Sequence, residues 1–167
     1  MKKPALVIIK PDGISKGLTG NILTKFSAAD LEIIAIKIMK STKELAKEHY
    51  KHIKGQPFFN DVINYLMGMG YRRKKLLGLI YYGEKSIKKC RKIAGATNPE
   101  EADPFSVRGS YGRITKSGLY ENVVHVSSDD KEAEREIKIW FEPDEITRDI
   151  YPTKTIVAPS IKKRIWK

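Results

Sequence analysis

The fold is decided by Ala5-Leu6-Val7-Ile8-Ile9-Lys10-Pro11-Asp12-Gly13 in a chain of 167 residues. The first five residues of this stretch are apolar and mostly branched, which predicts a buried strand. Pro11 and Gly13 predict a sharp change of direction after it, because proline ends a strand and glycine tolerates tight backbone turns. We therefore expect Lys10 at the C-terminal end of a buried strand.

Helical and strand-like segments alternate along the rest of the chain. Thr42 is placed to cap one helix, and Ser127 or Ser128 is placed to cap the last. The order β-α-β-α-α-β-α-β-α contains the ferredoxin-like split β-α-β arrangement, so we expect an α+β fold with a four-stranded antiparallel sheet backed by helices. The expected strands are 5–9, 31–39, 76–82 and 122–126, and the expected helices are 22–26, 43–52, 58–67, 84–93 and 129–141.

The length and composition fit one globular domain. Apolar residues make up 41% of the chain and charged residues 31%, and the longest apolar runs have the length of a strand rather than of a membrane span. The N-terminus does not resemble a secretion signal, so a cytoplasmic protein is expected. Residues 95–118 form a long segment with few apolar residues, which is typical of a functional loop.

The chain is strongly basic, with 32 lysines and arginines against 20 acidic residues and a formal charge of +12. Such a balance favours polyanionic partners, either free nucleotides or nucleic acid. A lysine-rich composition that reflects the host organism or heat tolerance is the alternative explanation. Cys90 is the only cysteine, which excludes an internal disulfide and a cysteine-rich metal cluster.

His125 lies where an apolar strand leads directly into a charged helix. A histidine at a strand end beside a helix N-terminus is a candidate nucleophile for phosphate. The alternative for a lone histidine is an ordinary core or surface position.

Glu136 lies on the helix that follows His125. The buried stripe of that helix is formed by Ala133, Ile137 and Trp140, which repeat at helical spacing, and Glu136 lies beside its centre. An inward carboxylate needs a partner because burial of an unpaired charge is costly, so a hydrogen bond to His125 is one possibility. The other is a solvated Glu136, or one paired with a neighbouring basic residue of the helix.

Seven short motifs occur in one order and together resemble those of nucleoside diphosphate kinases, over about residues 4–146. The chain has extra residues between Arg113 and Glu121, and this insertion resembles that of archaeal members of the family. The motifs are Ile9-Lys10-Pro11-Asp12-Gly13, Glu48-His49-Tyr50, Pro57-Phe58-Phe59, Gly95-Ala96-Thr97-Asn98-Pro99, Val107-Arg108-Gly109, Asn122-Val123-Val124-His125 and Ala133-Glu134-Arg135-Glu136.

The resemblance implies a ping-pong exchange, in which a histidine takes the γ-phosphate of a nucleoside triphosphate and gives it to a nucleoside diphosphate. It makes His125 the phosphate carrier, with Glu136 fixing the imidazole tautomer, Tyr50 beside the histidine, Phe58 stacking on the base and Asn122 contacting the sugar. The implied phosphate-binding residues are Lys10, Arg91, Thr97 and Arg108.

The resemblance also implies a magnesium ion, held mainly through the phosphates of the nucleotide. We expect no dedicated protein metal site, since Asp12 and Asp129 are more typical of carboxylates that cap turns and helices. Family members form hexamers, or tetramers built from dimers, so a homo-oligomer is expected. Residues 1–146 would be the catalytic domain and residues 147–167 a tail that packs at a subunit interface, through Ile156, Ile161 and Trp166.

The chain departs from the family pattern in four places. After the histidine the family usually has a small residue followed by Ser-Asp, whereas this chain has Val126-Ser127-Ser128-Asp129. Ser110 stands where the family usually has an acidic residue. Extra residues lie near 69–75 and between Arg113 and Glu121. These differences affect the loop that closes on the nucleotide and the residue near 119 that meets the base.

Two other functions fit part of the sequence. A nucleic-acid-binding module of the same ferredoxin-like scaffold would use the charge of +12 and the basic run 71–75, but its strand 5–9 lacks the aromatic residues of an RNA-recognition domain. A family member that retains only a scaffolding role is disfavoured because every matched catalytic position is filled. Nucleic-acid binding therefore stays a possible secondary activity.

Overall fold

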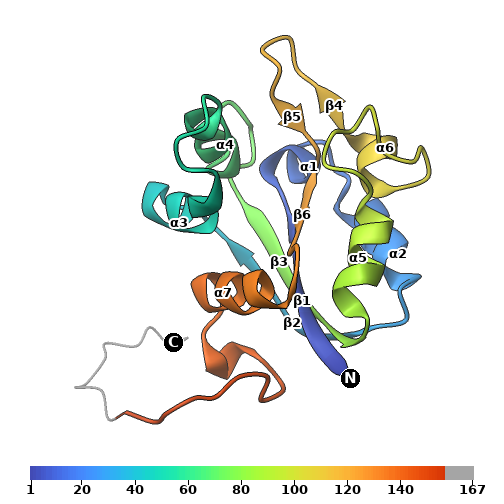
Figure 1. Cartoon of the computed structure of the whole chain (residues 1–167). Coiled ribbons are helices and arrows are strands. Elements are labelled where there is room, and N and C mark those ends of the chain that lie inside the picture. The colour runs from blue at the N-terminus through green and yellow to red at the C-terminus, as the bar shows by residue number, and fades with distance from the viewer. Residues whose placement is uncertain (157–167) are drawn as a thin grey trace, which may run out of the picture.

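The computed structural model describes residues 1–156 and contains the expected four-stranded antiparallel sheet (Figure 1). The strand order is β2-β3-β1-β6, and each neighbouring pair is antiparallel. The α+β prediction is thus confirmed. The strands are β1 (Lys2–Ile9), β2 (Glu32–Met39), β3 (Leu76–Glu84) and β6 (Val124–Val126).

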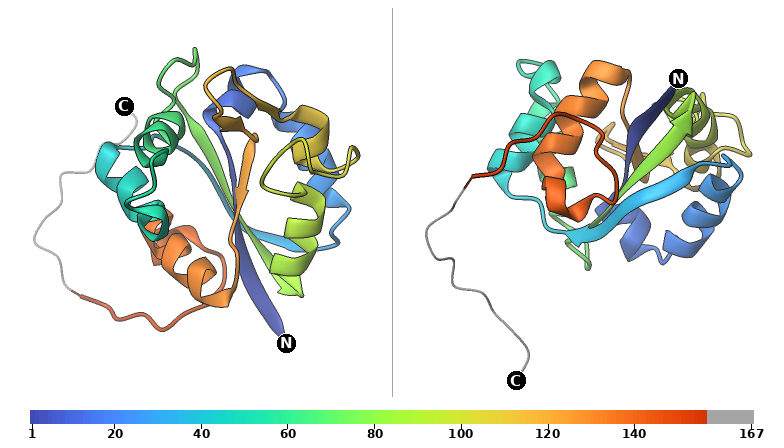
Figure 2. Two further views of the ribbon diagram at one scale, coloured as in Figure 1. Left: turned by 45° about the horizontal axis from the view of Figure 1, so that its top comes forward. Right: turned by 90° about the horizontal axis from the view of Figure 1, so that it is seen from below.

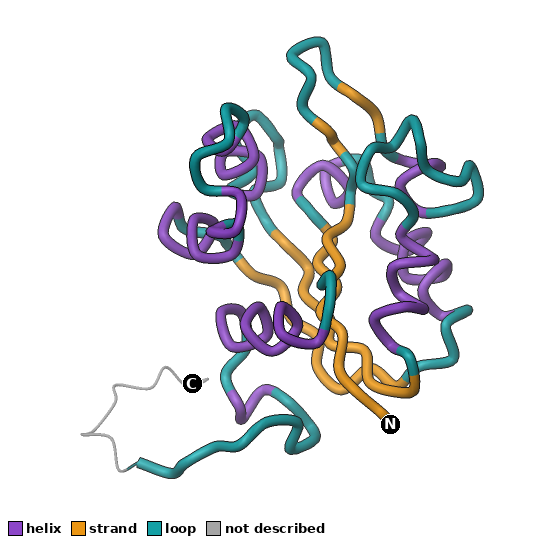
Figure 3. The backbone as a smooth tube through the Cα atoms, viewed as in Figure 1, coloured by secondary structure: helices purple, strands orange, loops and turns teal. Residues whose placement is uncertain are grey.

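Helices cover both faces of the sheet (Figures 2 and 3). Alternate residues of β1 enter two separate cores, with Val7 facing α2 and α5 and Ile8 facing α3, α4 and α7. The central strand is therefore buried on both faces, as its continuous apolar run predicts. The helices are α1 (Pro11–Ser15), α2 (Thr19–Ser27), α3 (Lys43–His49), α4 (Phe59–Leu66), α5 (Ser86–Ala94), α6 (Val107–Tyr111) and α7 (Asp130–Trp140), with 3-10 turns η1 (Lys51–Ile53) and η2 (Pro143–Glu145).

Two segments that the sequence presents as turn and loop contain regular structure. Pro11 opens the short helix α1, because its fixed φ and missing N–H suit the first helical position. The segment 95–118 contains α6, capped by the Ser106 side chain, and ends in a small hairpin of β4 (Arg113–Ile114) and β5 (Tyr120–Glu121). The turn formers in this segment therefore separate short elements rather than mark one long loop.

The predicted cap of the last helix is wrong. Asp129, not Ser127 or Ser128, is the N-cap of α7, and its Oδ1 accepts a hydrogen bond of 2.9 Å from the backbone N–H of Glu132. An aspartate in extended conformation is a strong N-cap, and here it lies one residue closer to the helix than Ser128. Thr42, by contrast, caps α3 as predicted, since its side chain accepts from Leu45.

The predicted strand 122–126 is shortened at Val123, so that β6 begins only at Val124. The Val123 φ of 57° lies in the left-handed region, which is unusual for a β-branched residue. The backbone N–H of Val123 donates to Asp12 Oδ2 at 3.2 Å, and its carbonyl accepts from the N–H of Lys10 at 2.8 Å. The fully buried Asp12 is therefore a backbone anchor for this turn.

Glu121 joins the two segments of extra length, 69–75 and 113–121. Its carboxylate accepts a hydrogen bond of 2.5 Å from the Tyr71 hydroxyl and another of 2.5 Å from Nε of Arg113, and Lys16 lies at 3.3 Å. Burial opposes ionisation, but these contacts outweigh it and lower the pKa of Glu121 to about 2. The two segments are thus connected to each other through one buried carboxylate.

We expect Glu121→Gln to reduce the free energy of unfolding by about 2 to 3 kcal/mol at pH 7, because the depressed pKa measures stabilisation of the folded state. This stabilisation is present above pH 4.5 and is lost as the pH falls toward 2. Urea titrations at pH 7 and pH 3 would measure it, with the exposed Glu100→Gln as control. An equal loss for both variants at pH 7 would contradict it.

Strand β2 forms one edge of the sheet and exposes a row of apolar side chains. Ile33, Ile36 and Ile38 are 47%, 54% and 59% exposed, and the register shifts between Ile33 and Ala35. In a regular strand Ile34, Ile36 and Ile38 would lie on one face, but the register shift interrupts this alternation. Ile34 alone of the three enters the core.

The C-terminal tail begins against its own domain. Thr147 donates through its backbone N–H and its hydroxyl to the carbonyl of Ile34, and Arg148 forms an ion pair with Glu32 at 3.0 Å. Ile156 is 72% exposed, whereas Ile161 and Trp166 lie outside the described residues. Over residues 1–156, no helix combines the length and the apolar character needed to cross a membrane.

Candidate active site

Two cavities that share five residues contain all the side chains predicted for the site. They lie at the end of the sheet where β1 leads into α1 and where β6 begins, with loops from α3, α5 and α6 around them. The first, of about 530 Å³, is lined by Lys10, Tyr50, Arg91, Thr97, Arg108, Asn122, His125 and Glu136. The second, of about 510 Å³, is lined by Phe58 and by Lys10, Tyr50, His52, Thr97 and Asn122, which also line the first.

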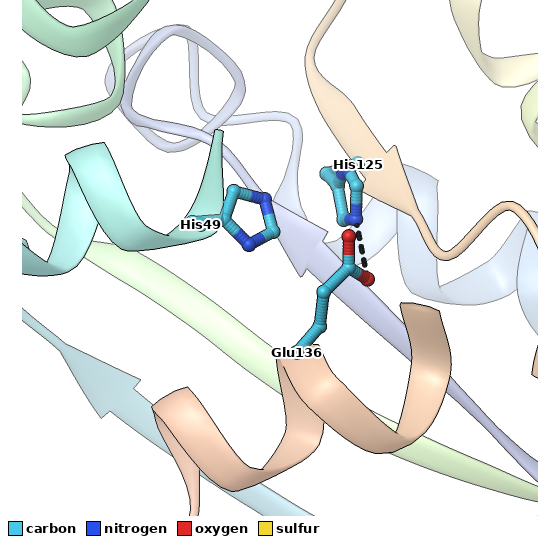
Figure 4. A group of neighbouring side chains, drawn as sticks. All are labelled: His49, His125 and Glu136. Carbon is cyan, nitrogen blue, oxygen red and sulfur yellow. Dashed lines mark hydrogen bonds and ion pairs between the residues drawn. The ribbon is translucent and has the colours of Figure 1, made fainter. Parts of the chain in front are cut away.

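His125 and Glu136 form the hydrogen bond that the sequence left open. His125 Nε2 lies 2.9 Å from Glu136 Oε2, and the carboxylate is almost completely buried (Figure 4). Because a carboxylate accepts, Nε2 carries the proton and the lone pair of Nδ1 is free. The alternative, a Glu136 paired with a basic residue of its own helix, is the weaker contact, because Arg135 lies 3.9 Å from Glu136 Oε1.

Ser127 also contacts Glu136, a role that the sequence did not indicate. Its hydroxyl donates to Glu136 Oε2 at 2.6 Å from a fully buried position directly after β6. Burial raises the pKa of Glu136, and His49, this hydrogen bond and Arg135 oppose that rise. The carboxylate is thus fixed in orientation from two sides.

His125 is neutral near pH 7. Burial lowers its pKa well below the usual range of a histidine, and the positive charges of Lys10 and Arg108 lower it further. The same cations would attract the phosphates of a nucleotide. The site therefore combines an uncharged imidazole with a positively charged cavity.

Lys10 and Arg108 are buried cations, and no carboxylate among residues 1–156 accepts a hydrogen bond from either of them. Lys10 Nζ donates to Asn122 Oδ1 at 2.7 Å, and Arg108 donates to the carbonyls of Gly95 at 2.8 Å and Val124 at 3.1 Å. Burial lowers the pKa of Lys10 to about 7 and that of Arg108 to about 10. Such unneutralised cations are suited to bind an anion from solution.

Asn122 connects the two cavities. Its side chain accepts from Lys10 and donates to the carbonyl of Thr97 at 2.9 Å, while its backbone N–H donates to the buried hydroxyl of Tyr65. Lys10 Nζ lies 4.9 Å from the centre of the Tyr65 ring. Tyr65 was missed because its apolar helical spacing indicates a core residue.

Phe58 and the β4–β5 hairpin face the second cavity. Phe58 precedes α4 and is 49% exposed, and Leu119 and Tyr120 of the hairpin line the same space. The ring of Phe58 is therefore available to a flat ligand. Leu119 and Tyr120 identify which part of the 113–121 segment meets it.

His49, His125 and Glu136 are the one group of potential metal ligands among residues 1–156, with ligand atoms within 4.8 Å of one another. Trp140 Nε1 donates to His49 Nδ1 at 3.2 Å. Since an indole N–H can only donate, the proton of His49 lies on Nε2, where it blocks metal binding. Nε2 of both histidines thus carries a proton. Asp12 Oδ2 and Asp129 Oδ1 accept hydrogen bonds from backbone N–H groups, and Asp12 Oδ1 is buried without a hydrogen-bond partner among residues 1–156.

Comparisons with known proteins identify the family. The profile of the family described as "Nucleoside diphosphate kinase" matches residues 3–146. The nucleoside diphosphate kinase of Pyrococcus furiosus is 39% identical over 141 residues, covering 84% of each chain. That of Methanosphaera stadtmanae is 36% identical over 157 residues, covering 94% of this chain and 97% of its own.

Comparison with solved structures identifies the same family. The nucleoside diphosphate kinase of Aquifex aeolicus is 32% identical and superposes with a TM-score of 0.78, over 87% of this chain and 99% of its own. A Borrelia burgdorferi nucleoside diphosphate kinase, described as a transition-state mimic with bound vanadate and ADP, also has a TM-score of 0.78, at 29% identity over 89% and 92% of the chains. The chain therefore belongs to the nucleoside diphosphate kinases, phosphotransferases that move the γ-phosphate of a nucleoside triphosphate to a nucleoside diphosphate by a ping-pong mechanism through phosphohistidine.

Proposed function

We propose that His125 is the phosphate carrier of this enzyme and that its Nδ1 is the attacking atom. The observation that carries this proposal is the free lone pair of Nδ1, left by the hydrogen bond of Nε2 to Glu136, in a cavity lined by Lys10, Arg91 and Arg108. In the first half-reaction Nδ1 forms a bond to the γ-phosphorus as the bond to the leaving diphosphate oxygen breaks. The second half-reaction reverses these steps with a new diphosphate.

The test is incubation with γ-labelled ATP and magnesium without an acceptor. We expect a label on the protein that is labile to acid and stable to base, and that is released when a nucleoside diphosphate is added. The absence of a label, or a base-labile one, would overturn the proposal.

The cations and polar groups of the first cavity are proposed to hold the phosphates. Lys10, Arg108 and the more exposed Arg91 would stabilise charge on the transferred group, and Thr97 and the Tyr50 hydroxyl would complete the contacts. Phosphoryl transfer depends mainly on such positioning and charge stabilisation. Burial raises the pKa of Tyr50, so its hydroxyl stays protonated and can donate.

Magnesium is proposed to enter the site bound to the nucleotide. The first cavity is lined by cations and by the occupied carboxylate Glu136, and this donor set does not fit an octahedral oxygen site made by the protein alone. When bound, the ion would neutralise the phosphate oxygens and orient them. The protein residues then bind the nucleotide through its remaining oxygens.

Nucleotide binding is expected to weaken as the pH rises through about 7. The protonated form of Lys10 attracts phosphate, and its pKa in the free protein is lowered to about 7, so above that pH binding must be accompanied by proton uptake. Isothermal titration of ADP at pH 6 and pH 8, in buffers of different ionisation enthalpy, would measure affinity and proton uptake together. Proton release at pH 8 would contradict this prediction.

Phe58→Ala is expected to weaken binding of all nucleotides to a similar extent. Base stacking contributes about 1 to 3 kcal/mol, and a ring face accepts every base. KM values for ADP, GDP and CDP would measure the effect, with Phe105→Ala as a control because that phenylalanine is 88% exposed and lines neither cavity. A loss confined to one base would contradict a stacking role.

A homo-oligomer is proposed as well. The exposed isoleucines 33, 36 and 38 of the edge strand β2 form an apolar row that a second copy of the chain would cover. The tail from residue 147, which starts beside β2 through Thr147 and Ile34, is proposed to pack at the same interface. Sedimentation of the wild type and of Ile36→Lys would test it, because a charge in the row should shift the protein toward smaller species.

A further inference from the structure

His49 is a fully buried histidine that packs directly behind His125. It is the last residue of α3, and the centres of the two rings are 4.4 Å apart with an angle of 76° between their planes. Figure 4 shows the edge of the His49 ring, with one of its nitrogens, directed at the face of His125. The contact thus brings an N–H-bearing edge to the ring proposed to carry phosphate.

Trp140 determines which nitrogen of His49 bears the proton. The indole N–H donates to Nδ1 at 3.2 Å, so neutral His49 must carry its proton on Nε2. Burial lowers the pKa of His49 well below its usual range, and His125 lowers it further, so the ring stays neutral. Its Nε2 is buried and has no hydrogen-bond partner among residues 1–156.

An unsatisfied buried donor destabilises the folded protein, so its place beside the active site calls for a reason. The face of a neutral imidazole attracts an N–H dipole, whereas an imidazolium repels it. The carboxylate of Glu136 lies close to the same N–H dipole, with ligand atoms of His49, His125 and Glu136 within 4.8 Å of one another, and a positive dipole end favours the ionised carboxylate. Both effects favour a neutral His125 beside an ionised Glu136.

We propose that His49 is a positioning residue whose Nε2–H, directed by Trp140, holds His125 oriented and neutral and Glu136 ionised, the state required for attack on phosphate. This inference deepens the proposed function and rests on His125 as the phosphate carrier. Simple packing is the competing role, and it would be fulfilled by any ring of similar size.

Three variants separate the donor from the ring. His49→Gln places an amide N–H near the position of Nε2 but gives up the acceptor for Trp140. His49→Asn keeps an acceptor near Nδ1 and removes the donor, and His49→Phe keeps the ring and removes both polar atoms. If the Nε2–H of His49 supports the reaction, the His49→Gln variant should resemble the wild type more than His49→Phe does, although phenylalanine is the better packing substitute.

The readout is the rate of phosphoenzyme formation from γ-labelled ATP as a function of pH. Loss of the N–H donor raises the pH at which His125 is neutral and Glu136 ionised. In His49→Phe and His49→Asn the acidic side of the pH–rate profile should therefore move up by about half to one pH unit. At pH values below this limb, phosphoenzyme formation should be about 3- to 10-fold slower than in the wild type. The other groups that face His125 are common to all variants. They are Lys10, Tyr50, His52, Arg91, Arg108 and Glu132.

Nitrogen-detected NMR of the wild type supplies a readout without turnover, since His49 should appear as the neutral Nε2–H tautomer between pH 5 and 8. The opposite tautomer, or a charged ring, would overturn the proposal. The proposal would also be overturned if the acidic side of the pH–rate profile moved equally in His49→Gln and His49→Phe, or moved in neither, whatever the thermal stabilities of the variants. If wild-type protein takes no label on His125, the proposed function fails, whereas the tautomer can still be determined.

Discussion

His125→Ala is expected to lose both the covalent label and turnover, with a fall in kcat of at least about 10,000-fold. The reason is that, of the two imidazoles that line the first cavity, His125 is the one held in a single tautomer by a hydrogen bond to a carboxylate. Lys10, Arg91 and Arg108 are cations, and Glu136 accepts hydrogen bonds from His125 and Ser127. Labelling with γ-labelled ATP and coupled steady-state assays would measure the two losses.

The chain offers a sharp control because it contains only three histidines. His49 is fully buried, and His52 has a side chain that is 49% exposed at the rim of the cavity. His52→Gln should therefore keep the acid-labile label, and peptide mapping should place it on His125. A label that survives in His125→Ala would assign the chemistry to another residue.

Lys10→Met is expected to produce a protein that is more stable and far less active. A pKa lowered from 10.5 to about 7 means that the charged form is disfavoured in the folded state, by about 3 to 5 kcal/mol below pH 7. Removing this charge should raise stability at pH 6, and the gain should shrink as the pH rises from 7 toward 10.5. Activity should fall about 100- to 1,000-fold, as for the loss of one group that stabilises transition-state charge.

Denaturant titrations of Lys10→Met and wild type at pH 6 and pH 10 would measure this trade-off beside kcat/KM. Lys47→Met is the control, because Lys47 is exposed on α3 and should change neither quantity appreciably. A Lys10→Met protein that is less stable at pH 6 would show that the hydrogen bond to Asn122 outweighs the burial of the charge.

The four strands of the sheet could be predicted because they follow from strong local patterns, whereas the order of the strands could not. The run Ala5 to Ile9 is apolar throughout and lies in the interior of the sheet, and Glu136 of α7 takes the inward one of the two positions that its spacing leaves open. Seven motifs in one order located the remaining site residues, which then converge in two cavities. Their convergence comes from the fold, which no single motif contains.

What could not be predicted depends on contacts between residues far apart in sequence. Trp140 was placed correctly in the core, but its hydrogen bond to His49 joins residues 91 positions apart and fixes a tautomer that spacing cannot show. Ser127 fits the pattern of a helix cap, yet its hydroxyl turns to Glu136 because Asp129 caps the helix. The left-handed Val123 depends on Asp12, a residue 111 positions away.

The placement of β6 has a consequence for the synthesis of the protein. This strand has three residues, lies at the edge of the sheet and pairs only with β1, which leaves the ribosome first. The partner of His125 lies on α7, the last helix of the described chain. A nascent chain therefore lacks the His125–Glu136 pair until α7 has left the ribosome.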